Sequence, residues 1–434
     1  MSELKQNMRP FLTSIVIVLF IISCASPKKK DSLYVISQPA EFEPQDAIWL
    51  IWPSNDHKEG ESVEKVMLAV IGAIAGEEKV IVTCRNTELL NHAKEVIKNH
   101  LGELENLKLL ELPSNDIWAR DMGPIFVKTN QNTIAIADFN FNSWGYTDTL
   151  NTDTKKDEMY DVNVAKQYGL HVLSSSMISE GGNREVNGKG TLITTESVEA
   201  GRNPNMTKKQ MEAEYKRLMG VNKIIWLKKG LVEDDHTFLG PLTTLSGAKA
   251  YTVVTTNGHI DEFARFVNDS TILFAQIDST AVNDPITFEN HKRMEENYRI
   301  LSKATDQDGK PFTIIRMPLP ATIFSTMKPG DFVYDYIKTL DYKDGSSFPN
   351  GDTVKVIAAL SYLNFIITNK IIVGQTYWRE GMANELKLKD EKAAQILRSV
   401  FPNRKVIMID ALAVNLGGGG IHCISMQQPE SPRR

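Results

Sequence analysis

Residues 416–423 read Leu-Gly-Gly-Gly-Gly-Ile-His-Cys, so four consecutive glycines lead into a cysteine near the carboxyl end of the chain. Glycine allows backbone angles that other residues avoid, and it lets another group come close to the main chain. Such a run suggests that something must lie against the backbone beside the thiol of Cys423. The alternative is a flexible loop before a buried structural cysteine. The stretch alone does not decide between a nucleophile and a core thiol.

The composition is typical of a soluble globular protein and disfavours some classes of partner. The chain has 434 residues, of which 42% are hydrophobic and 24% are charged. Its formal net charge of -5 gives no electrostatic basis for binding nucleic acid or an anionic membrane surface. Units of strand, helix and strand recur after residue 38 without a clear linker. This pattern predicts one repeat-built α/β domain over residues 38–434.

The first 37 residues have the features of an export signal. Basic residues precede the apolar run Phe11–Ile22, which is short for a membrane-spanning helix and is followed closely by Cys24. This arrangement is typical of a bacterial lipobox, in which the cysteine is lipidated and becomes the new N-terminus. We therefore predict a lipoprotein signal peptide over residues 1–23, a tether over residues 24–37 and anchoring through Cys24 in the cell envelope. An uncleaved anchor helix or an ordinary signal peptide is the alternative.

Two cysteines follow the predicted signal. Cys84 ends the β-branched segment Lys79–Cys84, which predicts a buried strand. Outside the cytoplasm Cys84 and Cys423 could form a disulfide. A chain of this size does not need one, and the bond would remove the Cys423 thiol, so we expect both cysteines to be free.

Two acidic segments lie beside predicted strands. The polar loop Asn115–Pro124 contains Asp116, Trp118 and Asp121. Carboxylates beside an arginine usually form a surface ion pair, but a tryptophan in a loop often packs against a binding pocket. Glu180 precedes two glycines, so a second acidic side chain has open backbone around it. The alternative there is a solvated glutamate in a glycine turn.

A histidine and a carboxylate stand two residues apart after another glycine. In a strand, His259 and Asp261 would share a face, because side chains alternate with a period of two. Such a pair is suited to acid–base catalysis. A structural histidine is the simpler interpretation. A zinc site is a further one, although a third ligand at close spacing is missing.

These candidate residues all flank predicted strands, so they can gather at one end of the strands. The set consists of Asp116, Asp121, Glu180, His259, Asp261 and Cys423. Carboxylates around a thiol raise its pKa and disfavour a thiolate. They favour a cation instead, and a planar guanidinium matches carboxylates pairwise. Because a bound cation would also lower the thiol pKa, the pattern predicts a cysteine enzyme acting on a guanidino compound.

The same stretches carry a resemblance to a known family. The sequence resembles the agmatine deiminases and bacterial-type peptidyl-arginine deiminases, within the guanidino-group-modifying enzymes, from about Gln38 to Pro429. The matching stretches occur in the family's order. They are Phe42-Glu43-Pro44, Trp49–Pro53, Asn115–Pro124, Glu180–Asn183, Gly258–Glu262, Gly417–Cys423 and Gln427–Pro429.

The resemblance implies a pentein fold, which is a five-bladed α/β-propeller of ββαβ units around a central site, with no metal or organic cofactor. It implies that Cys423 attacks the guanidinium carbon. His259 would protonate the leaving ammonia and then activate water, with Glu180 orienting it. The implied substrate-binding residues are Asp121, Asp261, Asp116, Trp118 and Asn364.

The reaction that the resemblance implies is hydrolysis of agmatine to N-carbamoylputrescine and ammonia. Two features depart from typical agmatine deiminases: a longer chain between Asp234 and Asn257, and the export signal. An exported peptidyl-arginine deiminase is therefore the alternative. A catalytically silent guanidine-binding lipoprotein is a hypothesis from another class. A papain-like protease is disfavoured because His259 precedes Cys423.

Overall fold

The computed structural model describes residues 32–432, and the chain from Tyr34 onward forms one compact unit. The predicted signal peptide, Cys24 and most of the predicted tether lie outside the described residues. β1 (Val35–Ser37) pairs with β5 (Ile125–Thr129), so the last three residues assigned to the tether belong to a strand. Among residues 32–432, no helix is both long and apolar enough to cross a membrane.

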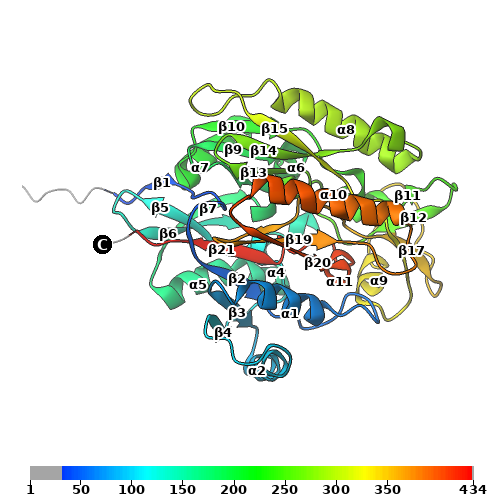
Figure 1. The fold of residues 1–434 in the computed structure, drawn as a ribbon, viewed down its shortest axis with the longest axis horizontal. Helices are drawn as coiled ribbons and strands as arrows, with labels where there is room; N and C mark the ends of the chain where they lie inside the picture. The colour runs from blue at the N-terminus through cyan, green and yellow to red at the C-terminus, as the bar shows by residue number, and fades with distance from the viewer. Residues whose placement is uncertain (1–31, 433–434) are drawn as a thin grey trace, which may run out of the picture. The chain divides into compact units, whose positions relative to one another are not determined.

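The repeating unit of the fold is clearest in the sheet that contains the last strand. β2 (Gln45–Ile51) runs parallel to β3 (Val80–Cys84), and α1 (Val63–Ile74) connects them. β4 (Leu107–Glu111) extends the sheet beside β3. β21 (Ser425–Pro429) pairs antiparallel with β2, and Figure 1 shows the red and blue strands side by side. The C-terminal strand therefore completes the unit that begins near the N-terminus.

Four further sheets in the described chain have the same order of an antiparallel pair, a helical crossover and a parallel strand. Their strands are β5, β6 (Ile134–Asn140) and β7 (His171–Ile178); β8 (Glu185–Val186), β9 (Thr191–Thr195) and β10 (Lys223–Leu227); β13 (Ala264–Asn268), β14 (Thr271–Gln276) and β15 (Thr313–Pro318); and β18 (Ile366–Ile367), β19 (Ile371–Thr376) and β20 (Lys405–Asp410). Their crossover helices are α4 (Thr152–Glu158) with α5 (Tyr160–Tyr168), α6 (Glu196–Arg202) with α7 (Lys208–Met219), α8 (Pro285–Leu301) and α10 (Asn384–Val400). The predicted α/β class is confirmed.

Local sequence explains where these helices begin and which face they bury. Ser62 caps α1 by accepting a hydrogen bond from the backbone of Lys65. The buried face of α1 consists of Val63, Val66, Met67, Leu68, Val70, Ile71 and Ile74. Thr207 and Gln210 form a capping box at the start of α7, and Gly220 ends that helix with a left-handed φ of 64°.

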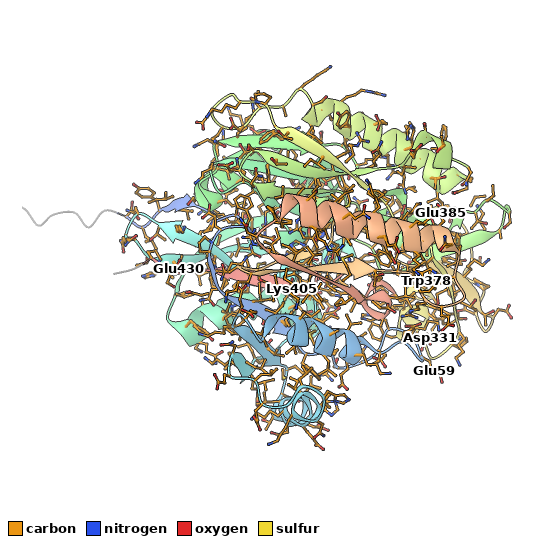
Figure 2. The ribbon with its side chains drawn as sticks, viewed as in Figure 1. Glu59, Asp331, Trp378, Glu385, Lys405 and Glu430 are labelled. Carbon is orange, nitrogen blue, oxygen red and sulfur yellow. The ribbon has the colours of Figure 1, made fainter. Side chains whose placement is uncertain are left out.

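A sixth sheet does not follow the repeat. It is assembled from two stretches far apart in sequence, in the order β11 (Leu242–Thr243), β12 (Lys249–Thr252), β17 (Val354–Ile357) and β16 (Phe324–Met327). The first pair lies in the long segment between Asp234 and Asn257. After β16, Asp331 accepts a hydrogen bond from the backbone N–H of Glu59 at 2.8 Å, and Figure 2 shows these two residues close together. α9 (Phe332–Ile337) follows directly and is thereby fixed beside the loop after β2.

One polar stretch is helical. The composition of residues 147–161 is typical of a surface loop, but the stretch contains α4 and the start of α5. Asn151 caps α4 by accepting hydrogen bonds from two backbone N–H groups. Asp157, 3% exposed, accepts hydrogen bonds from the backbone of the loop that contains Asp116. Polar composition is a poor guide here because two of the polar side chains of α4, Thr154 and Asp157, are buried with hydrogen-bond partners.

Candidate active site

Each of the five ββαβ units contributes the short segment that precedes the first of its hairpin strands. These segments place Asp121 before β5, Glu180 before β8, His259 and Asp261 before β13, Asn364 before β18, and Cys423 before β21. The side chains are distant in sequence but lie in equivalent positions of the repeat. The fold therefore supplies a physical reason why they meet.

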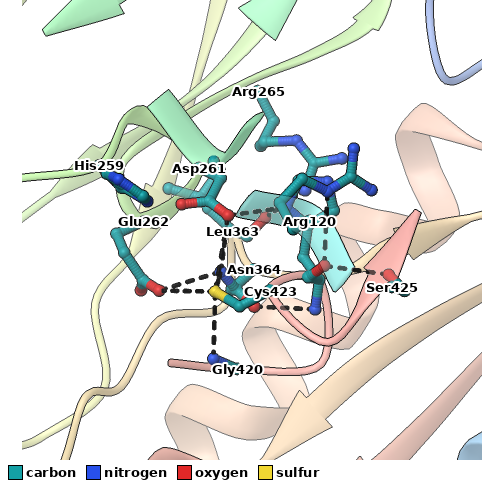
Figure 3. Close-up of polar contacts among 12 residues, drawn as sticks. Arg120, His259, Asp261, Glu262, Arg265, Leu363, Asn364, Gly420, Cys423 and Ser425 are labelled. Carbon is teal, nitrogen blue, oxygen red and sulfur yellow. Dashed lines mark hydrogen bonds and ion pairs between the residues drawn. The ribbon is translucent and has the colours of Figure 1, made fainter. Parts of the chain in front are cut away.

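Cys423 is buried, with 4% of its surface exposed, and its sulfur lies among polar groups (Figure 3). The Sγ atom accepts hydrogen bonds from Asn364 Nδ2 at 3.1 Å and from the backbone N–H of Gly420 at 3.4 Å. Asp261 Oδ2 lies 3.6 Å from Sγ and Glu262 Oε1 lies 3.8 Å from it. Burial and the charges of these two carboxylates raise the thiol pKa well above its ordinary value. The unliganded site therefore holds a neutral thiol.

The glycine run packs tightly against this site, so the flexible-loop interpretation is wrong. Gly418 has a φ of 128°, and a Cβ atom there would collide with the carbonyl oxygen of Val254. A Cβ atom at Gly419 would lie 2.9 Å from Cys423 Sγ and 2.9 Å from the Trp118 ring. The groups that approach this backbone are thus the protein's own, and they hold the nucleophile candidate in place.

His259 lies at the entry to a short 3-10 helix, η5 (Ile260–Glu262), and not in a strand. The prediction that it shares a strand face with Asp261 is therefore wrong. Gly258, with a φ of 107°, turns the chain immediately before it. The backbone N–H of His259 donates to Asp234 Oδ2 at 3.1 Å, which fixes the turn.

The His259 ring lies between two carboxylates. Its Nδ1 is 3.6 Å from Asp121 Oδ1, and its Nε2 is 3.5 Å from Glu180 Oε2. Burial alone would lower the pKa of His259, but the negative charges of Asp121 and Glu180 outweigh burial and raise it to about 9. At neutral pH the ring is therefore an imidazolium that can donate a proton.

Glu180 is fully buried, and its charge is balanced by a residue that the sequence pattern did not single out. Arg202 in α6 donates from Nε to Glu180 Oε1 at 2.6 Å, and neither side chain is exposed. Burial acts to raise the pKa of Glu180, but the charge of Arg202 and the interaction with His259 lower it to about 2. Glu180 therefore stays ionised beside His259.

Asp121 is held by two donors. Trp144 Nε1 donates to its Oδ2 at 2.8 Å, and the backbone N–H of Gly182 donates to its Oδ1 at 2.9 Å. Burial raises the pKa of Asp121, although the positive charge of His259 acts against that change. The space beside Gly182 is occupied by the His259 ring and the Asp121 carboxylate, which explains why a glycine stands there.

Asp261 is fixed through only one of its oxygens. His422 Nδ1 lies 2.8 Å from Oδ2, and Asn364 Nδ2 donates to the same oxygen at 3.2 Å. Oδ1 is buried and has no hydrogen-bond partner among residues 32–432. Burial acts to raise the pKa of Asp261, but the hydrogen bond and charge of His422 lower it overall. The carboxylate is thus ionised, with one acceptor free.

A cavity of about 430 Å³ reaches Asp121 and Cys423, and aromatic side chains line much of it. Trp118 stacks on His57, with ring centroids 5.9 Å apart, and meets Trp144 edge-on at 6.4 Å. Phe332 and Tyr336 of α9 also line the cavity. Aromatic walls of this kind suit the aliphatic part of a ligand.

The charged side chains that line the cavity are mainly acidic. Asp116, Asp153 and Asp157 line it together with Arg85. Asp116 lines the same cavity as Cys423. Burial raises the pKa of Asp116, and burial together with the charge of Asp116 raises that of Asp157 to about 7.

The structure also bears on the possibility of a metal site. Among the described residues, Asp261, Glu262 and Cys423 form the group whose ligand atoms, all within 4.8 Å of one another, could hold an ion. Asn364 Nδ2 lies 3.2, 2.9 and 3.1 Å from those three side chains. An amide donor therefore occupies the position that a cation would need, and we assign no ion to this group.

Several residues of the site were not found from the sequence pattern. They are Glu41, Trp144, Arg202, Glu262 and His422. Glu262 and His422 stand directly beside singled-out residues, so adjacency was a usable signal. Arg202 lies in an ordinary amphipathic helix, and nothing in its local sequence distinguishes it from a surface arginine.

Comparison with known proteins gives a consistent result. Residues 37–239 and 242–429 match the family described as Porphyromonas-type peptidyl-arginine deiminase. The chain is 31% identical to the agmatine deiminase of Medicago truncatula, covering 90% of this chain and 96% of that protein. It is 30% identical to the agmatine deiminase of Pseudomonas aeruginosa strain UCBPP-PA14, with 91% and 96% covered. The solved structure of Enterococcus faecalis agmatine deiminase matches with a TM-score of 0.70 and 25% identity, over 91% of this chain and 96% of that one.

Proposed function

The chain belongs to the Porphyromonas-type peptidyl-arginine deiminase family, and on that premise we propose that it hydrolyses the guanidino group of agmatine, forming N-carbamoylputrescine and ammonia. The observation that carries the proposal is the position of the Cys423 sulfur, 3.6 Å from Asp261 and 3.8 Å from Glu262. Carboxylates this close disfavour a thiolate attacking a neutral or anionic substrate. A cationic electrophile removes that penalty.

The acceptors in the site suit a planar cation. A guanidinium presents N–H groups in pairs, which match carboxylate oxygens. Asp261 Oδ1 is buried and has no partner within the described chain, so a substrate N–H would satisfy it. Asp121 supplies the second carboxylate. The positive charge of the bound guanidinium would lower the pKa of Cys423 and prepare its sulfur for attack.

The reaction then divides into two steps. In the first, the Cys423 thiol passes its proton to Asp261 or Glu262, and Sγ forms a bond with the guanidinium carbon. The His259 imidazolium gives its proton to one terminal nitrogen, so the C–N bond breaks, ammonia leaves and a thiouronium remains on Cys423.

In the second step, His259 is neutral and takes a proton from water. The hydroxide bonds to the same carbon, the C–S bond breaks, and the ureido product leaves. Glu180, held by Arg202, keeps the ring oriented during both proton transfers. As the C–S bond breaks, the remaining hydroxyl proton passes to the Cys423 sulfur. The carboxyl group that took the thiol proton gives it to the ammonia, which leaves as ammonium, so the site returns to its starting state.

The charged lining of the cavity favours a substrate with a second positive charge. Asp116, Asp153 and Asp157 line it together with one cation, Arg85. The pKa of Asp116 and Asp157 is raised, so an ammonium beside them would favour their ionised form, whereas the carboxylate of free arginine would disfavour it. Peptidyl arginine has neither charge at this position, and the family description makes it the second candidate.

The test is to incubate the purified protein with agmatine, free arginine and an arginine-containing peptide, and to measure ammonia and ureido product. We expect the highest kcat/KM with agmatine. Turnover of the peptide alone would favour the citrullinating alternative, and binding of agmatine without turnover would favour a silent binding protein. Cys423→Ala should abolish turnover without unfolding the protein, whereas Cys84→Ser is the matched control and should retain it.

We further propose that the protein is exported and lipid-anchored. The support is the sequence of residues 1–24, with basic residues, an apolar run and a cysteine in lipobox order. Cys24→Ser should move the protein from the membrane fraction to the soluble fraction and remove its labelling by a fatty-acid probe. Unchanged membrane retention would favour an uncleaved anchor.

A further inference from the structure

His422 directly precedes the nucleophile candidate Cys423 in the chain. It is buried, with 1% of its surface exposed. Both of its ring nitrogens face carboxylate oxygens. Nδ1 lies 2.8 Å from Asp261 Oδ2, and Nε2 lies 2.8 Å from Glu41 Oε1. Figure 3 shows Asp261, Asn364 and Cys423 grouped together. The reaction steps derived above do not use His422.

The two contacts fix the ring in place. Each ring nitrogen has a carboxylate oxygen as its partner. Glu41 also receives hydrogen bonds from Arg120 at 2.9 Å and from Arg265 at 2.7 Å, which keep it ionised. The ring of His422 is therefore held at both nitrogens, and Glu41 with its two arginines fixes the side away from Asp261.

The fixed ring of His422 affects the substrate side of the site. By holding Oδ2 of Asp261, it leaves Oδ1 as the oxygen that can receive a guanidinium N–H. The backbone N–H of His422 also donates to Asn364 Oδ1 at 2.9 Å, and the Nδ2 of the same amide contacts Asp261 and Cys423. One residue thus sets the orientation of both the carboxylate and the amide beside the sulfur.

We propose that His422 is a positioning residue: its buried side chain, anchored on Glu41, holds Asp261 in the orientation that receives the substrate guanidinium. The inference rests on the proposed function, because it assigns the free oxygen of Asp261 to that substrate. It concerns binding and orientation of the cation, and His422 itself contacts neither the substrate nor the reacting atoms.

Two amide substitutions separate the two contacts of the ring. The amide of His422→Asn lies near the position of Nδ1, so it can still donate to Asp261. The amide of His422→Gln reaches the position of Nε2, so it can donate to Glu41 but not to Asp261. We expect His422→Gln to lower kcat/KM for agmatine by about 10- to 100-fold, and His422→Asn to lose several-fold less. His92→Gln, at an exposed histidine paired with Glu64, is the matched control, and its kcat/KM for agmatine should equal that of the wild type.

A second measurement separates positioning from general loosening of the fold. Cys423 is alkylated with a cationic haloacetamidine, which needs Asp261, and with neutral iodoacetamide, which does not. His422→Gln should reduce the rate with the amidine at least 10-fold and the rate with iodoacetamide less than about twofold. This comparison needs only a folded protein, checked by thermal unfolding. If His422→Gln does not fold, His422→Asn provides the comparison, with a smaller selective loss expected.

The outcomes distinguish the inference from the proposed function. Unchanged kinetics in both variants, equal losses in both, or equal slowing with both alkylating agents would overturn the positioning role. A wild-type protein that hydrolyses no guanidine would refute the proposed function. In that event the ratio of the two alkylation rates would still test whether His422 positions Asp261.

Discussion

Removing the charge of Glu180 tests how the site makes His259 a proton donor. The pKa of His259 is raised from 6.5 to about 9, and that difference is worth about 3 kcal/mol in favour of the imidazolium. Glu180 and Asp121 lie at similar distances from the ring, 3.5 and 3.6 Å. Glu180→Gln should therefore remove roughly half of the shift. It also leaves the Arg202 charge uncompensated nearby, so we expect the pKa of His259 to fall by about one to two units.

The assay is the pH dependence of kcat/KM, which reports ionisations of the free enzyme and free substrate. Because the imidazolium is the active form, wild-type activity should decline as the pH rises through about 9. The decline for Glu180→Gln should occur roughly one to two pH units lower. Butylguanidine should be measured beside agmatine, since its guanidinium stays charged across this range. Glu64→Gln, at an exposed ion pair, is the control.

Two results would refute this reasoning. A decline at the same pH in the variant and the wild type would mean that Glu180 does not set the proton affinity of His259. Activity that increases as the pH rises through 9 would mean that a free thiolate must form before substrate binds. In either case the assignment of His259 as the resting proton donor would be wrong.

Three further predictions follow from the same geometry. Gly419→Ala places a Cβ atom 2.9 Å from both Cys423 Sγ and Trp118, so kcat should fall by about 100-fold or more; near-wild-type turnover would contradict this packing. Arg202→Met leaves the buried charge of Glu180 unpaired and should lower the free energy of unfolding by about 3–5 kcal/mol, measured by urea denaturation; a change below 1 kcal/mol would show that the pair is not buried as described. Protonated His259 stabilises the fold fully below its unfolded-state pKa of 6.5, and this stabilisation is lost as the pH rises to about 9. The free energy of unfolding of the wild type should therefore fall by up to about 3 kcal/mol over that range, and that of His259→Gln should fall by less. Equal falls in both proteins would exclude this contribution.

The sequence predicts the repeat well because four of the five ββαβ units are each encoded in one continuous stretch, and one unit joins β21 to β2. Apolar runs and caps, such as the Thr207–Gln210 capping box, mark where elements begin. The sixth sheet was not predicted, since β12 and β17 pair across about a hundred residues and neither has a long strand pattern. Its α9 supplies Phe332 and Tyr336 to the cavity, so part of the binding surface was missed with it.

The candidate residues of the site were found from chemistry, but their supporting partners were not. Carboxylates, a histidine and a thiol beside glycines are recognisable as functional types. The side chains that fix them, including Arg202 and His422, contact residues 22 and 161 positions away. Such pairings depend on which repeat segments meet in space, and the order of residues along the chain does not specify them.

The most direct test of the account is to trap the intermediate. The protein is mixed with agmatine, quenched in acid within one turnover, digested and analysed by mass spectrometry. The account predicts an adduct on the peptide that contains Cys423, with the mass of the substrate less ammonia. Under conditions in which the control Cys84→Ser still forms this adduct, His259→Gln and Cys423→Ala should form none. Turnover in the wild type with no adduct on Cys423 under these conditions, or with the adduct on another residue, would contradict the covalent mechanism.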